Sequence, residues 1–353
     1  MSNDSNKTAR NAEAPPPPFY ICREHKSTVN YLHLFDKDQY LASCDNDGWI
    51  VIWKMQTKRP IKKWKAHQSS CLKVYSIDND TKLISQGRDN KIHIWKLITA
   101  AEEQQQQQME DLPELISSIT YNGVGFCKFA CFEAKQAVIL CFPSKEELSM
   151  FDIYDLTNEH YILQNVNDDT GTLRLGTCMA VQMFVPSNLP QQNEEDHDIK
   201  TSFHVLAGYE SGMVVLWDLG ATRHSERKKI LWHRHEHKEP ILDLAVDNTH
   251  LFGLSSSADN QLCNYSLSTG ETVKRITLKK SGVVSLRIRS DNKIFASGGY
   301  DNRIRLFSVK TMKPLAILSY HKGSVYSLEF GRENHSLLIG GSEDNRISLW
   351  NIY

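Results

Sequence analysis

Short runs of alternating apolar and polar residues recur along the chain, and many of them end in an aromatic residue. Two clear examples are KIHIW at 91–95 and RISLW at 346–350. Alternation with a period of two is typical of β-strands that bury one face. The pattern therefore predicts an all-β protein built from many short antiparallel strands.

An aspartate lies six positions before the terminal aromatic residue in five of these runs. The pairs are Asp47/Trp53, Asp89/Trp95, Asp259/Tyr265, Asp301/Phe307 and Asp344/Trp350. Four of the repeats also carry a histidine 22 or 23 positions before the aspartate, at His25, His67, His237 and His321. Lys279 stands at this place in the remaining repeat. Similarity at a fixed period marks a repeat architecture, and this spacing is the WD-repeat pattern.

Two further repeats are degenerate. One ends at Phe151 with Lys145 in the aspartate position, and the other ends at Trp217 with Ser211 there. A four-stranded blade has two exposed faces, which only stacking against neighbouring blades can bury. Seven repeats therefore predict a seven-bladed WD-repeat β-propeller.

The last blade needs a strand from elsewhere, because only three residues follow Trp350. Phe19–Cys22 precedes His25 as Leu315–Leu318 precedes His321, so we expect the N-terminal strand to close this blade. The predicted organisation is a disordered tail over 1–15 and a single propeller over 16–353. Polar insertions at about 101–112 and 187–201 are expected to form long loops.

Within a blade, the histidine and the aspartate should meet and hold the aromatic residue through a hydroxyl group. The predicted structural clips comprise His25, Asp47, Trp53, His67, Asp89, Trp95, His237, Asp259, His321, Asp344 and Trp350. Such a set resembles a nucleophilic triad, but catalytic sites do not recur blade after blade. We therefore expect no catalytic residues and no enzymatic activity.

The residue before each marker aspartate should face solvent on the rim of the channel. The candidate partner-binding positions are Asn46, Arg88, Glu210, Tyr300 and Glu343. Arginine and tyrosine on a rigid scaffold are favoured anchors for a partner peptide or loop. Ordinary exposed polar residues remain the alternative interpretation.

Composition narrows the remaining possibilities. A net charge of −1 gives no overall attraction to nucleic acid or to an acidic membrane. The chain has no apolar run of transmembrane length, and its eight cysteines show no metal-type spacing, which predicts reduced thiols in the nucleus or cytoplasm. We expect no cofactor, no metal and no small-molecule substrate; His233, His235 and His237 form only a weak metal signal. Lys62, Lys63 and Lys65 keep a nucleic-acid or chromatin reader open as the alternative function.

Several stretches go beyond what a propeller requires. They are PPPPF at 15–19, LISQGRDNKIHIW at 83–95, NGVGFCKF at 122–129, LAGYESGMVVLWDL at 206–219, HKEPILDLAVD at 237–247, SGGYDNRIRLFSVKTMKPLAIL at 297–318 and the terminal RISLWNIY. Across about 15–353, the chain resembles the ASTRA-associated WD-repeat protein family, whose animal relatives are called G-protein-β-like. Residues such as Gln86 and Thr311 are not needed by the clip or the strand pattern, so the resemblance is specific.

This resemblance implies a scaffold subunit of the ASTRA complex, acting in chromatin remodelling and in the maturation of PI3-kinase-related kinases. The implied partners are those kinases, the Rvb-type AAA+ ATPases and the telomere-length-regulation cochaperone subunits. It also implies a nuclear location, with the cytoplasm as a second compartment.

Overall fold

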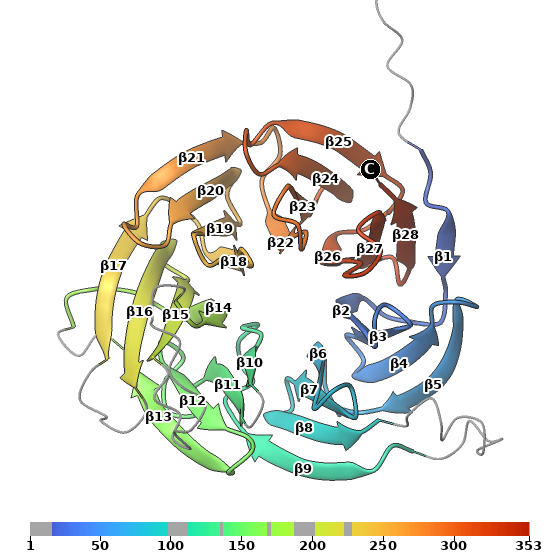
Figure 1. Ribbon diagram of the computed structural model, residues 1–353, viewed down its shortest axis with the longest axis horizontal. Coiled ribbons are helices and arrows are strands. Elements are labelled where there is room, and N and C mark those ends of the chain that lie inside the picture. Colours follow the sequence, from blue (N-terminus) through green and yellow to red (C-terminus); the bar gives the residue numbers. More distant parts are fainter. Residues whose placement is uncertain are drawn as a thin grey trace, which may run out of the picture.

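The computed structural model describes residues 16–97, 112–134, 137–167, 171–186, 202–221 and 228–352. These residues form seven four-stranded antiparallel sheets arranged in a ring around a central channel (Figure 1). The predicted seven-bladed propeller is therefore confirmed. The predicted tail over 1–15 and nearly all of the two predicted insert loops lie outside the described residues.

The first four sheets follow the chain order from the channel outward. Their strands are β2 (Val29–Phe35), β3 (Tyr40–Asp45), β4 (Trp49–Lys54) and β5 (Arg59–Lys65); β6 (Cys71–Ile77), β7 (Lys82–Gly87), β8 (Lys91–Lys96) and β9 (Leu115–Thr120); β10 (Ala130–Ala134), β11 (Ala137–Pro143), β12 (Phe151–Asp155) and β13 (His160–Val166); and β14 (Cys178–Phe184), β15 (Ser202–Tyr209), β16 (Met213–Ala221) and β17 (Lys229–His235).

The remaining sheets complete the ring. Their strands are β18 (Ile241–Val246), β19 (Phe252–Ser257), β20 (Gln261–Ser266) and β21 (Thr272–Thr277); β22 (Val283–Ile288), β23 (Ile294–Gly299), β24 (Arg303–Ser308) and β25 (Pro314–Ser319); and β26 (Val325–Phe330), β27 (Leu337–Ser342) and β28 (Ile347–Asn351), joined by β1 (Tyr20–Cys22).

Strand β1 supplies the fourth strand of the last sheet, at its outer edge (Figure 1). It runs antiparallel to β28, with Tyr20 opposite Leu349 and Cys22 opposite Ile347. The amide of Phe19 extends this pairing by donating to the carbonyl of Leu349 at 2.9 Å. The expectation that the N-terminal strand closes the last blade is therefore confirmed.

The first and last blades contact each other through both apolar and polar groups. Val29 and Leu32 of β2 pack in one core cluster with Ile339 of β27 and Leu349 of β28, which joins the first blade to the last. The carboxylate of Asp38 accepts hydrogen bonds from three successive backbone amides at 332–334, at 2.8–3.0 Å. Strand pairing and these contacts close the ring, and residues 23–28 connect β1 in the last sheet to β2 in the first.

Four of the five turns that follow the marker aspartates share one backbone requirement. The residue after the aspartate has a positive φ at Asn90, Asn302 and Asn345, and a glycine takes this place at Gly48. Asparagine and glycine tolerate the left-handed conformation better than other residues. At Gly48, an added Cβ atom would also lie 2.2 Å from the carbonyl oxygen of His67, so only glycine fits there.

Candidate functional site

Two blades contain the complete clip with its hydroxyl on the second strand. His67 contacts the Asp89 carboxylate through Nδ1 at 3.0 Å and Ser85 Oγ through Nε2 at 2.8 Å, and Trp95 Nε1 donates to the same hydroxyl at 2.8 Å. Burial alone would raise the pKa of Asp89, but the hydrogen bond and charge of His67 outweigh it and hold that pKa below its usual value. The histidine is thereby fixed at both ring nitrogens.

The blade of β18–β21 repeats this arrangement with a tyrosine in place of the tryptophan. His237 contacts Asp259 at 3.1 Å and Ser255 Oγ at 2.7 Å, and the Tyr265 hydroxyl lies 3.0 Å from Ser255 Oγ. Burial lowers the pKa of His237 despite the neighbouring carboxylate. The clip is therefore a buried hydrogen-bonded network, and removing one member would leave its partners unpaired.

The last blade uses a hydroxyl from a different strand. His321 contacts Asp344 through Nδ1 at 3.1 Å, but its Nε2 meets Ser348 Oγ of β28 at 2.7 Å. Trp350 Nε1 also donates to Ser348 Oγ, at 2.8 Å. Gly340 stands where the other clips carry serine, so the serine on the neighbouring strand supplies the hydroxyl instead.

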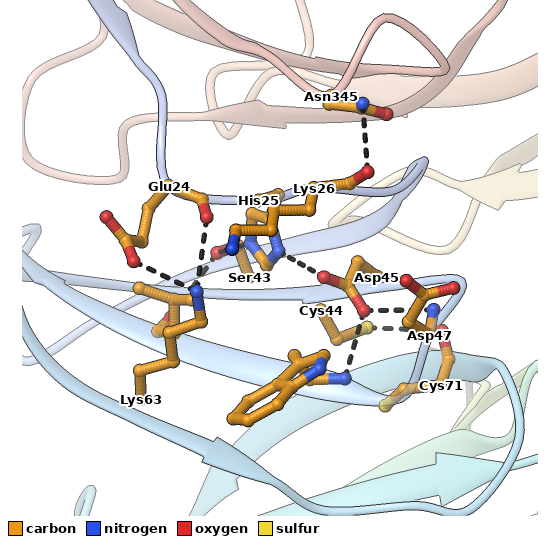
Figure 2. Close-up of polar contacts among 12 residues, drawn as sticks. Glu24, His25, Lys26, Ser43, Cys44, Asp45, Asp47, Lys63, Cys71 and Asn345 are labelled. Carbon is orange, nitrogen blue, oxygen red and sulfur yellow. Dashed lines mark hydrogen bonds and ion pairs between the residues drawn. The ribbon is translucent and has the colours of Figure 1, made fainter.

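The prediction that Asp47 belongs to the first clip is wrong. His25 Nδ1 contacts Asp45 Oδ2 at 2.7 Å and its Nε2 contacts Ser43 Oγ at 2.7 Å, as Figure 2 shows. Asp45 ends β3 and is 2% exposed, whereas Asp47 lies in the turn and is exposed. The amide of Asp47 donates to Asp45 Oδ1 at 3.0 Å, and Trp53 Nε1 donates to Ser43 Oγ at 2.8 Å.

Asp45 takes over the role because it occupies a strand position that other repeats leave small. The corresponding residue of the next blade is Gly87, where an added Cβ atom would lie 2.2 Å from His67 Nδ1. A side chain at this strand position therefore lies directly beside the histidine. Asp47 was predicted because it lies six positions before Trp53. This spacing does not show which of the two carboxylates faces the inside of the blade.

The repeat without a histidine uses an arginine. Asp301 accepts a hydrogen bond from Arg305 Nη1 at 3.0 Å, and Ser297 Oγ stays buried without a hydrogen-bond partner. In the degenerate fourth blade, Trp217 Nε1 donates to the Tyr209 hydroxyl at 3.2 Å. Each of these aspartate or tryptophan side chains is thus held by a different polar group.

The predicted rim residues separate into two clusters, around Tyr300 and around Arg88, and two lone positions, Asn46 and Glu210. Tyr300 lies beside Tyr326, with ring centroids 6.5 Å apart in an edge-on arrangement. The Glu343 carboxylate accepts hydrogen bonds from the Ser324 amide and hydroxyl, at 3.1 and 2.9 Å. Asn46 is exposed, and its blade lies between the blade that carries Arg88 and the blade that carries Glu343.

The second cluster surrounds Arg88. Its guanidinium group lies 4.3 Å from the centre of the Phe126 ring and donates to the carbonyl of Val124 at 2.9 Å. Val124 and Phe126 are 62% and 59% exposed, although both are apolar. Neither residue was among the predicted contact positions. The apolar run NGVGFCKF at 122–129, which contains both, could have indicated an exposed apolar loop between strands. Glu210, in another blade, is held by Thr177 through bonds of 3.0 and 2.8 Å.

The residues of the weak metal signal do not form one site. His233 and His235 are exposed on the outer strand β17, while His237 is buried in its clip. In the described part of the chain, His67, Asp89 and His93 have ligand atoms within 4.8 Å of one another. His67 uses both ring nitrogens in its clip, and its ring stacks on His93. Burial and the His67 ring lower the pKa of His93 to about 4.

The basic residues kept for the alternative function lie on the outer strand β5. Lys63 pairs with Glu24 at 2.9 Å (Figure 2). Its Nζ lies 5.3 Å from the centre of the Trp49 ring. Lys65 lies 5.9 Å from the centre of the same ring.

All eight cysteines are free thiols, and seven of them are buried. No helix in the described residues is long and apolar enough to cross a membrane.

Comparison with known proteins adds the family. The sequence profile of a family described as ASTRA-associated protein 1 matches residues 18–335. The chain belongs to the ASTRA-associated protein 1 family. Among relatives named ASTRA-associated protein 1, one from Penicillium rubens is 32% identical over 94% of this chain and 85% of its own length. Another, from Schizosaccharomyces pombe, is 30% identical over 96% of this chain and 99% of its own length.

An animal protein is equally similar. The guanine nucleotide-binding protein subunit beta-like protein 1 of Mus musculus is 30% identical over 96% of this chain and 97% of its own length. The resemblance to this family and to its G-protein-β-like relatives is therefore confirmed, and it extends over nearly the whole ring.

Proposed function

We propose that this member of the ASTRA-associated protein 1 family is a non-enzymatic scaffold subunit of the ASTRA complex. The observation that carries the proposal is the family match over 18–335 on a closed propeller. The repeating His-Asp sets support a structural role, because their side chains are buried in hydrogen bonds within the blades. A rigid ring then leaves its rim and outer strands for partners.

The partners proposed are PI3-kinase-related kinases, Rvb-type AAA+ ATPases and telomere-length-regulation cochaperone subunits. The proposed role is in kinase maturation and chromatin remodelling, in the nucleus and also in the cytoplasm. Two rim clusters offer contact surfaces: Arg88 with Val124 and Phe126, and Tyr300 with Tyr326. Exposed aromatic and arginine side chains are the types that dominate binding energy at protein interfaces.

Affinity purification of the tagged full chain, followed by mass spectrometry, tests the proposal. We expect to recover large kinases, AAA+ ATPases and cochaperone subunits. A double variant, Phe126→Ala with Tyr300→Ala, should lose at least about ten-fold of one partner, as expected for interface anchors. Leu315→Ala is the matched control, because Leu315 is 55% exposed on β25, outside both clusters. Recovery of none of these protein classes would contradict the assignment.

The alternative, a chromatin or nucleic-acid reader, rests on the basic face of β5. It predicts binding that weakens steeply with salt and weakens further when Lys62, Lys63 and Lys65 are replaced by glutamate. The pairing of Lys63 with Glu24 already neutralises part of this face. A titration with duplex DNA that shows no salt-dependent binding would remove this alternative.

A further inference from the structure

Charged side chains from five blades converge inside the central channel. The channel holds a cavity of about 320 Å³, a size that binds small molecules in many proteins. A smaller cavity of about 20 Å³ lies beside it. The two share Tyr31, Lys73, Gln182 and Arg287, whereas Lys128 lines only the smaller one. The charged residues and the histidine that line the two cavities are His33, Lys73, Lys128, Asp243, Arg287, Glu329 and Arg332.

Three of these cations meet at one aromatic ring. The centre of the Tyr31 ring lies 5.4 Å from Lys73 Nζ, 5.3 Å from Lys128 Nζ and 5.1 Å from the Arg287 guanidinium carbon. Tyr31 itself is 8% exposed. Like charges brought together at such a site repel one another strongly, because the channel wall screens them less than water does.

The two carboxylates balance only part of this charge. Arg287 lies 3.4 Å from Asp243 and 3.7 Å from Glu329, so both acids pair with the same arginine. His33, which lies 4.0 Å from Glu329, is buried, and burial lowers its pKa well below the usual value. Among the lining residues, four lysines and arginines therefore face two carboxylates, an excess of two positive charges.

Lys73 and Lys128 carry this excess, because Arg332 lies close enough to Glu329 for the carboxylate to raise the pKa of Arg332 despite its burial. Lys73 is 8% exposed and donates to the carbonyl of Phe129 at 2.7 Å, which uses one of its three N–H groups. Within the described part of the chain, neither ammonium group forms an ion pair with a carboxylate. Burial lowers the pKa of each lysine to about 8, so both remain largely charged at pH 7.

We propose that the channel binds a compact oxyanion with two negative charges, phosphate or a small phosphate ester, between Lys73 and Lys128. Two ammonium groups with free N–H donors match the charge and the acceptor oxygens of such an anion. The position inside the channel, between the innermost strands, favours a small free molecule over a segment of a partner protein. The anion would also relieve the repulsion among the cations around Tyr31.

Isothermal titration calorimetry with inorganic phosphate, at constant ionic strength in chloride, tests this site on the full chain. We expect saturable binding at one site, and Lys128→Gln should weaken it by roughly ten-fold, as for loss of one charge-assisted hydrogen bond. Glycerol 2-phosphate in a parallel titration shows whether the site prefers the free ion or an ester. Lys229→Gln, an exposed lysine on β17, is the matched control and should bind like the unaltered protein.

Melting curves in chloride show whether each variant is folded. Lys73→Met, at the buried lysine, provides a second test of whether phosphate binding is weakened. General stabilisation by phosphate acts over the whole surface and does not saturate, so it affects all variants equally. Absence of saturable binding to the unaltered protein would overturn the proposal. Equal weakening by Lys128→Gln and Lys229→Gln would overturn it as well.

Discussion

Deleting residues 1–22 removes β1 and leaves the last blade with three strands. The outer edge of β28 is then exposed, because Ile347, Ser348 and Leu349 lose their paired strand. Deleting 1–14 instead leaves β1 in place. The two truncations therefore separate the effect of the closing strand from that of the residues before it.

The cost follows from the contacts of β1. Phe19 donates to Leu349, and the three residues of β1 pair in register with β28. At about 1 kcal/mol of net stability for each backbone hydrogen bond, roughly three such bonds contribute about 3 kcal/mol. Burial of the Cys22 side chain, which is 3% exposed, adds roughly 1 kcal/mol. The total is about 4 kcal/mol.

Thermal unfolding followed by circular dichroism measures this loss. In a protein of this size, each kcal/mol lowers the melting temperature by about 2 °C, so deletion of 1–22 should lower it by roughly 8 °C. Deletion of 1–14 should leave it within about 1 °C of the full chain, because β1 and its pairing with β28 stay intact. Equal melting temperatures for the two truncations would refute the role assigned to β1.

Three further predictions concern single residues. Asp45→Ala should lower the free energy of unfolding by about 3 kcal/mol, because it leaves buried His25 and two turn amides unpaired. Asp47→Ala should change it by less than about 0.5 kcal/mol. Urea denaturation that ranks the two variants the other way would contradict the clip. Asn345→Ala should cost about 2 kcal/mol, from the positive φ of 63° and the lost bond to the N-terminal loop, with Asn345→Gly recovering the backbone part. The affinity of the channel for an anion should fall as pH rises from 7 to 9, because Lys73 and Lys128, whose pKa is lowered to about 8, lose their charge over this range. Sulfate is the probe, because its own charge is constant there. A constant affinity would exclude the two lysines as the binding groups.

The repeat and its closure were predictable because they are local in the sequence. A period-two alternation and a fixed Asp-to-aromatic spacing report on strands and turns that lie within about forty residues of one another. The shortage of one strand at Trp350 and the spare strand at Phe19–Cys22 then required only that the ring be closed. Clips such as His67 with Asp89 follow from the same local spacing.

The tertiary structure decided which side chains face each other. Asp45 is the last residue of β3 and Asp47 follows it by two positions, but only Asp45 contacts His25 inside the blade. Likewise, Arg88 meets Phe126 only because a loop of the next blade folds over the rim. Spacing along the chain carries no information on either orientation.

The channel is the extreme case. Tyr31, Lys73, Lys128, Asp243 and Arg287 come from separate blades, and successive members of this set are at least 42 positions apart in the sequence (31 to 73). None of them has a local sequence signature, because a single tyrosine or charged residue on or beside an innermost strand does not show what it faces across the channel. The sequence determined that seven blades close around a channel, whereas ring closure in three dimensions determined which charges meet inside it.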